Sequence, residues 1–184
     1  LERASARETA SRVALGSICR QLLERFGIRV ISHVRQVGDV QAAEIDPSAS
    51  LSELEELIEA SELSCVDSTA TEAMKATIKK AWQDGDSLGG VIEVIAEGLP
   101  VGLGDYSQWD RKLDGRLAQA LMSIQAMKAV EIGDGIEAAG KPGSLVHDPL
   151  YPNEADGELP FRRNSNKAGG LEGGRVAGSP GGDG

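Results

Sequence analysis

The sequence predicts an α+β fold, because helical and strand-like segments follow one another without a strict β-α-β alternation. Four segments space their apolar residues as amphipathic helices do, whereas β-branched and other apolar residues crowd into two short runs, 28–34 and 91–96. Hydrophobic residues make up 40% of the 184 residues, which is enough for one domain with a core. The predicted order is helix, strand, helix, helix, strand, helix, with no convincing internal repeat.

The first helix is predicted over residues 5–26, with Gly27 as its stop signal. Its apolar positions fall on one face, at the spacing i, i+3, i+4, i+7 and i+11. The β-branched run 28–34 that follows is predicted to be a strand. The residues on the apolar face of the helix are Leu15, Ile18, Cys19, Leu22 and Phe26.

Two Ser/Thr-x-x-Glu patterns, Ser50–Glu53 and Thr69–Glu72, match the capping box that begins many helices. The first is expected to open a short helix, and the second a longer helix that ends at Gly85. The run 91–96 is then predicted to be a buried strand, since it is short and mostly apolar.

A long helix is predicted over 112–130, where apolar residues form a continuous stripe. Helical spacing stops at Gly133, and four prolines between there and Phe161 predict a long surface loop. We assign residues 1–174 to one core and residues 175–184 to a loosely structured tail rich in glycine and proline.

The formal net charge of −10 argues against a generic binder of nucleic acid or of an anionic membrane surface. No apolar run in the sequence approaches the roughly 20 residues that span a bilayer. Cys19 and Cys65 are not spaced as metal ligands, so we expect no metal site and two reduced, buried thiols, as in a cytoplasmic protein. An anionic ligand would need a local cluster of arginine side chains and backbone N–H groups.

One such cluster lies at the start of the first predicted helix, where Arg3 and Arg7 flank Ser5. Free N–H groups at a helix N-terminus and the planar guanidinium of arginine both suit a phosphate. The same residues allow a second interpretation, since Ser5 and Glu8 form a capping box and the arginines could simply be solvated. The two interpretations are compatible, because a capped helix start still presents its arginines.

Three further stretches carry little chemistry by themselves. Asp86–Val94 predicts a turn into a strand, Trp109–Gly135 predicts an amphipathic core helix, and Asn166–Gly174 predicts a flexible glycine-rich loop. The last stretch is not a dinucleotide-binding fingerprint, since no strand-to-helix turn surrounds it. Together with Arg3–Glu8, and in this order, the stretches resemble the signature segments of the chorismate synthase family.

The resemblance implies that Arg3, Ala4 and Ser5 contact the flavin cofactor FMN. It also implies that Ser5 and Arg7 hold the substrate, 5-enolpyruvylshikimate 3-phosphate. Three further flavin contacts are implied along the chain: Gln125, Ala126 and Gly173.

The fold implied by the resemblance is a β-α-β sandwich, with helices held between antiparallel sheets, and the implied assembly is a homotetramer. The implied reaction is an anti-1,4-elimination of phosphate that yields chorismate for aromatic amino acid biosynthesis. It needs reduced FMN, with NADPH as one candidate reductant. The family's two catalytic histidines belong to motifs upstream of the matched segment. We therefore assign no catalytic role to His33 or His147 and expect the 184-residue chain alone to be inactive.

A rival interpretation is a non-catalytic, acidic α+β fragment that keeps an oligomerisation or interaction surface without an activity of its own. A third, a phosphate-binding regulatory domain, rests on Arg3–Glu8 alone. Titration with FMN separates a flavoenzyme from the non-catalytic fragment, provided that the flanking segments of the family are restored.

Overall fold

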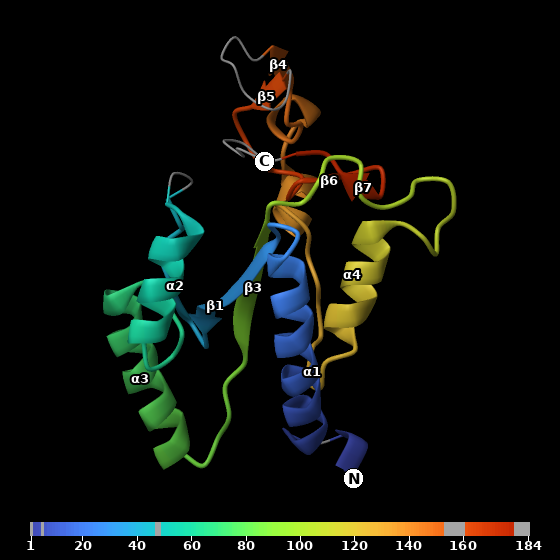
Figure 1. The fold of residues 1–184 in the computed structure, drawn as a ribbon. Helices are drawn as coiled ribbons and strands as arrows, with labels where there is room; N and C mark the ends of the chain where they lie inside the picture. The colour runs from blue at the N-terminus through green and yellow to red at the C-terminus, as the bar shows by residue number, and fades with distance from the viewer. Residues whose placement is uncertain (1, 5, 47–48, 153–160, 179–184) are drawn as a thin grey trace. The chain divides into compact units, whose positions relative to one another are not determined.

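The computed structural model describes residues 2–4, 6–46, 49–152 and 161–178. Its contacts divide the chain into two compact units. Figure 1 shows the helices and strands of both. One unit is Val30–Ala96, and the other joins Leu1–Arg29 with Glu97–Gly184.

A three-stranded sheet with the order β2-β1-β3 runs through the unit Val30–Ala96. Strand β1 (Arg29–Val37) pairs antiparallel with β2 (Val40–Gln41) across a two-residue turn. Gly38 in this turn has a φ of +58°, a backbone angle that favours glycine. Strand β3 (Gly90–Glu97) lies on the other side of β1.

Helix α2 (Leu51–Ala60) begins with the predicted capping box. The Ser50 N–H donates to Glu53 Oε2 at 2.9 Å, and the Glu53 N–H donates to Ser50 Oγ at 3.3 Å. Both N–H groups would otherwise lack a partner at the helix start, so the sequence pattern and the observed bonds agree.

Helix α3 (Ser68–Gln83) begins differently from the prediction, since Thr69 is not its N-cap. The cap is Asp67, whose carboxylate accepts the Ala70 N–H at 3.0 Å and the Ala43 N–H at 3.1 Å. These hydrogen bonds, that from Ala70 foremost, lower the pKa of Asp67 by favouring its ionised form. One carboxylate thus fixes both the helix start and an earlier stretch of chain.

Two small apolar clusters form the core of this unit. In the first, Leu51 and Leu54 of α2 pack against Ile31 of β1. In the second, helix α3 packs close to β2, in agreement with the contact between these two elements. The buried members of the second cluster are Ala42, Cys65, Ala70 and Met74.

Strand β3 covers the predicted run 91–96, but the prediction that this strand is buried is wrong. Val91 and Ile92 are each 46% exposed, and Val94 is 43% exposed. Ile95 packs partly buried against the first core cluster. An apolar run therefore predicts the strand without telling which of its faces is covered.

In the other unit, helix α1 (Ala6–Glu24) follows a 3-10 turn at Glu2–Ala4 and lies within the predicted range 5–26. All of α1 is described and none of its residues is buried. Its predicted apolar face is 60–65% exposed at Leu15, Ile18 and Leu22, and Phe26, beyond the helix end, is 71% exposed. The prediction of two buried thiols is confirmed for Cys65 but wrong for Cys19, which shares this exposed face.

Helix α4 (Leu113–Met122) is shorter than the predicted helix 112–130. Ser123 is its C-cap, and Ala126 adopts a φ of +69°. This left-handed conformation cannot continue a right-handed helix. The apolar spacing of the sequence therefore runs on past the point at which the backbone turns.

The predicted loop 133–161 contains regular structure in its described part. Two short 3-10 helices, Gly135–Gly140 and Gly143–Leu145, precede strand β4 (Leu150–Pro152). This strand pairs antiparallel with β5 (Phe161–Arg163). The prediction of a structureless loop is therefore wrong over these elements.

Strand β6 (Leu171–Glu172) pairs antiparallel with β7 (Arg175–Val176). The predicted loose tail is thus wrong at its first two residues, while residues 179–184 lie outside the described part. The boundary at residue 174 stays a prediction. Short antiparallel sheets and separate helices agree with the α+β class.

Candidate functional site

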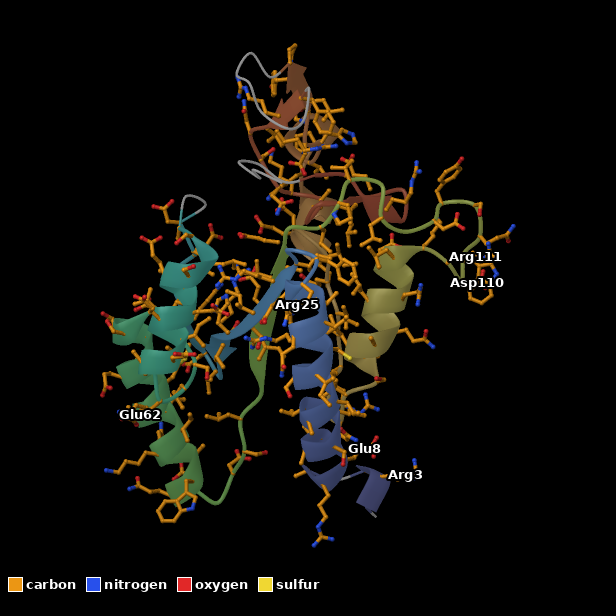
Figure 2. The ribbon with its side chains drawn as sticks, in the orientation of Figure 1. Arg3, Glu8, Arg25, Glu62, Asp110 and Arg111 are labelled. Atoms are coloured by element: carbon orange, nitrogen blue, oxygen red, sulfur yellow. The ribbon has the colours of Figure 1, made fainter. Side chains whose placement is uncertain are left out.

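The predicted substrate and flavin residues at the beginning of the chain lie around the N-terminal end of α1. Arg3 and Ala4 are exposed on the preceding 3-10 turn, and Arg7 is exposed in the first helical turn. Ser5, to which the resemblance gives both roles, lies outside the described residues. Figure 2 shows the side chains of Arg3 and Glu8 at this end of α1. The helix start thus offers cationic side chains together with N–H groups, as an anion requires.

Gln125 joins this end of α1, although it lies far away in the sequence. Its Nε2 donates to the carbonyl oxygen of Arg3 at 3.2 Å, across 122 residues. Thr9 Oγ1 donates to Gln125 Oε1 at 3.1 Å. Both ends of the amide are therefore engaged, and the fold brings two of the predicted flavin residues, Arg3 and Gln125, together.

A second bond beside this amide also joins the two helices. Arg12 Nη1 donates to Ser123 Oγ at 2.8 Å, and Arg12 Nε lies 3.4 Å from Glu8 Oε1. The sequence predicted no role for Thr9, Arg12 or Ser123. No local pattern could have found them, because their partners lie more than a hundred residues away.

Ala126, another predicted flavin contact, is exposed on the turn that follows α4. Its positive φ is uncommon for a residue with a Cβ and costs conformational energy. The Met127 N–H closes this turn by donating to the Ile124 carbonyl oxygen at 3.3 Å. The turn places Gln125 and Ala126 next to each other beyond the helix end.

Gly173 lies in the two-residue turn between β6 and β7. It has a φ of +60°, is exposed, and has open space where a Cβ would stand. Its neighbour Gly174, at φ +86°, is packed: an added Cβ would lie 2.6 Å from Lys112 Cγ. The Leu113 N–H donates to the Gly174 carbonyl oxygen at 2.8 Å, so the hairpin is anchored to the start of α4.

The predicted flavin residues thus gather in two places and not in one. Gly173 lies by the first residue of α4, whereas Gln125 lies just beyond the last. Ten helical residues separate these ends by about 15 Å. Figure 2 shows Arg111 beside the first end of α4 and Arg3 beside the start of α1. A ligand that contacts both places would have to span this distance.

A buried polar cluster lies beneath the loop Asn166–Gly174. The Asp148 carboxylate accepts the Lys167 N–H at 3.0 Å, the Ala168 N–H at 2.8 Å and the Ser165 hydroxyl at 2.5 Å. Burial raises the pKa of Asp148, but the accepted hydrogen bonds and the charge of Arg163 together hold this pKa below its usual value.

Arg163 extends this cluster toward Gly173. Its side chain is 7% exposed and pairs with Glu172, with Nη2 2.9 Å from Oε2 and Nη1 3.3 Å from Oε1. It also donates to the carbonyl oxygens of Asp148 and Ala177. The sequence did not predict Asp148 or Arg163 as site residues, because only the folded chain brings them under the loop.

The two histidines occupy different environments. His33 is buried in β1, and its Nε2 lies 2.9 Å from Glu93 Oε2. This bond foremost lowers the pKa of Glu93. His147 is exposed in the turn that follows the second 3-10 helix.

Among the residues that the structure describes, no group of three or more His, Cys, Asp or Glu side chains could hold a metal ion. None of the described helices is long and apolar enough to cross a membrane. A groove of about 450 Å³ lies beside β1, α3 and β3, but it is mostly apolar and contains none of the predicted site residues.

Comparison with known proteins decides the family. Residues 1–180 match the family model described as chorismate synthase. The chain belongs to the chorismate synthase family. The resemblance carried by Arg3–Glu8, Trp109–Gly135 and Asn166–Gly174 is therefore confirmed.

Individual chorismate synthases are similar over nearly the whole chain. The chorismate synthase of Brevibacillus brevis is 56% identical over 180 residues, which are 98% of this chain and 45% of that protein. The chorismate synthase of Geobacter sulfurreducens is 54% identical over 178 residues, 95% of this chain and 45% of that protein. The chain thus spans less than half the length of these relatives.

The fold of the chain is also that of the chorismate synthase family. A crystal structure of a chorismate synthase matches with a TM-score of 0.86 and 46% identity, over 96% of this chain and 54% of that one. The predicted α+β, chorismate synthase-like fold is confirmed. The family match does not favour the rival interpretation of a non-catalytic interaction fragment.

Proposed function

We propose that this chain is the central part of an enzyme that eliminates phosphate from 5-enolpyruvylshikimate 3-phosphate and so forms chorismate. One observation supports this most: the Gln125 amide bonds to the Arg3 carbonyl oxygen. Two family segments, separated by 122 residues, thereby meet at the end of α1 that suits an anion.

In this proposal the substrate phosphate is held at the start of α1. Arg7 lies in the first turn, where its guanidinium can donate to phosphate oxygens, and Ser5 supplies a hydroxyl. The C–O bond to phosphate breaks and the hydrogen at C6 is lost as a proton, so the new double bond forms without net redox change. A chain with a net charge of −10 needs such focused cationic groups to hold a polyanion.

The flavin residues in this proposal are Arg3, Ala4 and Ser5 at the start of α1, Gln125 and Ala126 after α4, and Gly173 in the β6–β7 turn. Their surroundings suit a flat, elongated cofactor. Gly173 has open space on its Cβ side, and Ala126 is exposed. Bound here, reduced FMN, with NADPH as one candidate reductant, would supply the transient electron density that phosphate loss needs.

The assembly and location follow the family in the same way: a homotetramer in the cytoplasm, with no role for nucleic acid or membrane. The two catalytic histidines of the family match no residue of this sequence. We therefore expect the 184-residue chain by itself to bind its ligands weakly and to lack turnover.

The test uses the complete enzyme, meaning this chain with the flanking segments of the family restored, for example those of the Brevibacillus brevis relative. Supplied with reduced FMN and 5-enolpyruvylshikimate 3-phosphate under anaerobic conditions, it should release phosphate and form chorismate, followed by chorismate absorbance. A folded complete enzyme that forms no chorismate contradicts the proposed function. Turnover by the 184-residue chain alone contradicts the need for the family's histidines.

A further inference from the structure

We propose that Asp148 and Arg163 are positioning residues, which hold the loop Asn166–Gly174 in the shape that presents the backbone of Gly173 to the flavin. Neither residue is among the flavin or substrate positions that the family signatures supply. The inference rests on the proposed function, since it takes FMN as the ligand of this loop. We call the two residues and their bonds the Asp148–Arg163 clamp.

The Asp148 carboxylate holds the beginning of the loop. It accepts the backbone N–H groups of Lys167 and Ala168, at 3.0 and 2.8 Å, and the hydroxyl of Ser165. Asp148 is 6% exposed, so its oxygens are satisfied by these donors and not by solvent. Two consecutive N–H groups that point at one carboxylate fix the direction of the chain entering the loop.

The Arg163 guanidinium holds the end of the loop. It pairs in a bidentate fashion with Glu172, the residue before Gly173, and donates from Nε to the Ala177 carbonyl oxygen at 3.3 Å. It also donates to the Asp148 carbonyl oxygen, which links the two halves of the clamp. Arg163 is itself placed by the β4–β5 hairpin, where it pairs with Leu150.

The middle of the loop is held by close backbone packing. The Asp134 N–H donates to the Lys167 carbonyl oxygen at 2.7 Å. A Cβ on Gly133 would lie 2.0 Å from that oxygen, and a Cβ on Gly169 would lie 2.6 Å from Gly133 N. The loop is thus fixed at its start, middle and end, whereas the Cβ side of Gly173 stays open.

The charges of the clamp also suit an anionic ligand. Glu172 adjoins the exposed Gly173, and an unpaired carboxylate there would repel a flavin phosphate. Arg163 compensates that charge through two hydrogen bonds. Ion pairs add little net stability compared with apolar packing, so geometric specificity is the better explanation for the charged groups that hold this loop.

The test compares Asp148→Asn with Glu137→Gln in the complete enzyme. Asp148→Asn keeps the side-chain shape but replaces one accepting oxygen with a donor, so one loop N–H loses its partner. Glu137→Gln makes the same chemical change at an exposed carboxylate that pairs with Lys141. Three quantities are measured: the FMN dissociation constant by fluorescence titration, the visible spectrum of the bound flavin, and hydrogen exchange at the amides of Lys167 and Ala168.

Asp148→Asn should weaken FMN binding about tenfold, alter the bound-flavin spectrum and speed exchange at the two amides, because the loop is then free to leave the bound shape. Glu137→Gln should leave all three quantities unchanged. Ser165→Ala removes a single bond to Asp148 and should give a smaller shift in the same direction. If Asp148→Asn fails to fold, the same three measurements on Ser165→Ala test the clamp.

A folded Asp148→Asn enzyme with the unaltered dissociation constant and spectrum overturns the inference. Weaker FMN binding with unchanged exchange at Lys167 and Ala168 also overturns it, because Asp148 then acts by another route. An unsubstituted enzyme that is folded but binds no FMN contradicts the proposed function itself. The two failures are therefore distinguishable.

Discussion

The Gln125 side chain donates a hydrogen bond to the Arg3 carbonyl oxygen at 3.2 Å, and this bond joins the turn after α4 to the turn before α1. The partly buried Thr9 hydroxyl holds the other end of the same amide. The pair therefore sets the geometry of the candidate site from two distant parts of the sequence.

Gln125→Glu should weaken FMN binding by roughly tenfold in the complete enzyme, since it removes the donor and brings a carboxylate to the Arg3 carbonyl oxygen. Gln119→Glu makes the same change on the exposed surface of α4 and serves as the matched control. Fluorescence titration with FMN gives both dissociation constants. Equal FMN dissociation constants for the two variants would show that Gln125 is not part of the flavin site.

Gly173→Ala should mainly weaken FMN binding, whereas Gly174→Ala should mainly lower the stability of the fold. Both place a Cβ at positive φ, which costs about 1–2 kcal/mol of unfolding free energy. At Gly174 the new Cβ also meets Lys112 Cγ at 2.6 Å, so the melting temperature should fall further there. At Gly173 the space is open, so the larger effect should be on FMN binding.

Thermal unfolding and FMN titration of the two variants check this contrast. The proposed role of Gly173 fails if Gly173→Ala binds FMN as tightly as the unsubstituted enzyme. The packed position of Gly174 is contradicted if the two variants lose the same amount of stability.

The structure shows which features of the fold could be predicted from the sequence. Ser50 and Glu53 form a capping box because both partners lie within one helical turn, and the prediction there is confirmed. Thr69 fits the same pattern, yet Asp67 caps α3, since its carboxylate also holds Ala43, 24 residues earlier. Local patterns predict local hydrogen bonds and miss a competitor whose advantage comes from a distant segment.

In the candidate site, too, the contacts between distant segments could not be predicted from local patterns. The family resemblance supplied Arg3 and Gln125, and the fold joins them. It supplied nothing about Asp148 and Arg163, whose partners lie up to 20 residues away along the chain and meet only in three dimensions. The end of α4 was missed for another reason, because the left-handed backbone of Ala126 leaves no trace in its side chain.

The Asp67 cap predicts a pH dependence of stability. The folded-state pKa of Asp67 lies below its ordinary value of 3.8, because the ionised carboxylate accepts the Ala70 and Ala43 N–H groups. The contribution of Asp67 to the free energy of unfolding is therefore present above the unfolded-state pKa and is lost as the pH falls through the folded-state pKa. Asp67→Asn keeps one accepting oxygen at every pH, so it should cost about 1 kcal/mol at pH 7.

The difference in free energy of unfolding between Asp67→Asn and the unsubstituted protein should shrink toward zero in acid. Protonation then leaves Asp67 with one free acceptor as well. Urea unfolding at pH 7 and near pH 3, followed by circular dichroism, measures both free energies of unfolding. An unchanged difference at the two pH values would contradict the two-acceptor role of Asp67.

Arg7 should matter for the substrate more than for the flavin. In the proposed function its guanidinium donates charge-assisted hydrogen bonds to the substrate from the first turn of α1, and each such bond contributes about 1.5–3 kcal/mol. Arg7→Ala in the complete enzyme should therefore raise KM by roughly 10- to 100-fold, while the FMN dissociation constant changes little. Arg20→Ala, on the same helix but three turns further on, is the control and should leave KM unaltered. If Arg7→Ala leaves KM unchanged, or weakens FMN as strongly as substrate, Arg7 does not belong to the substrate site.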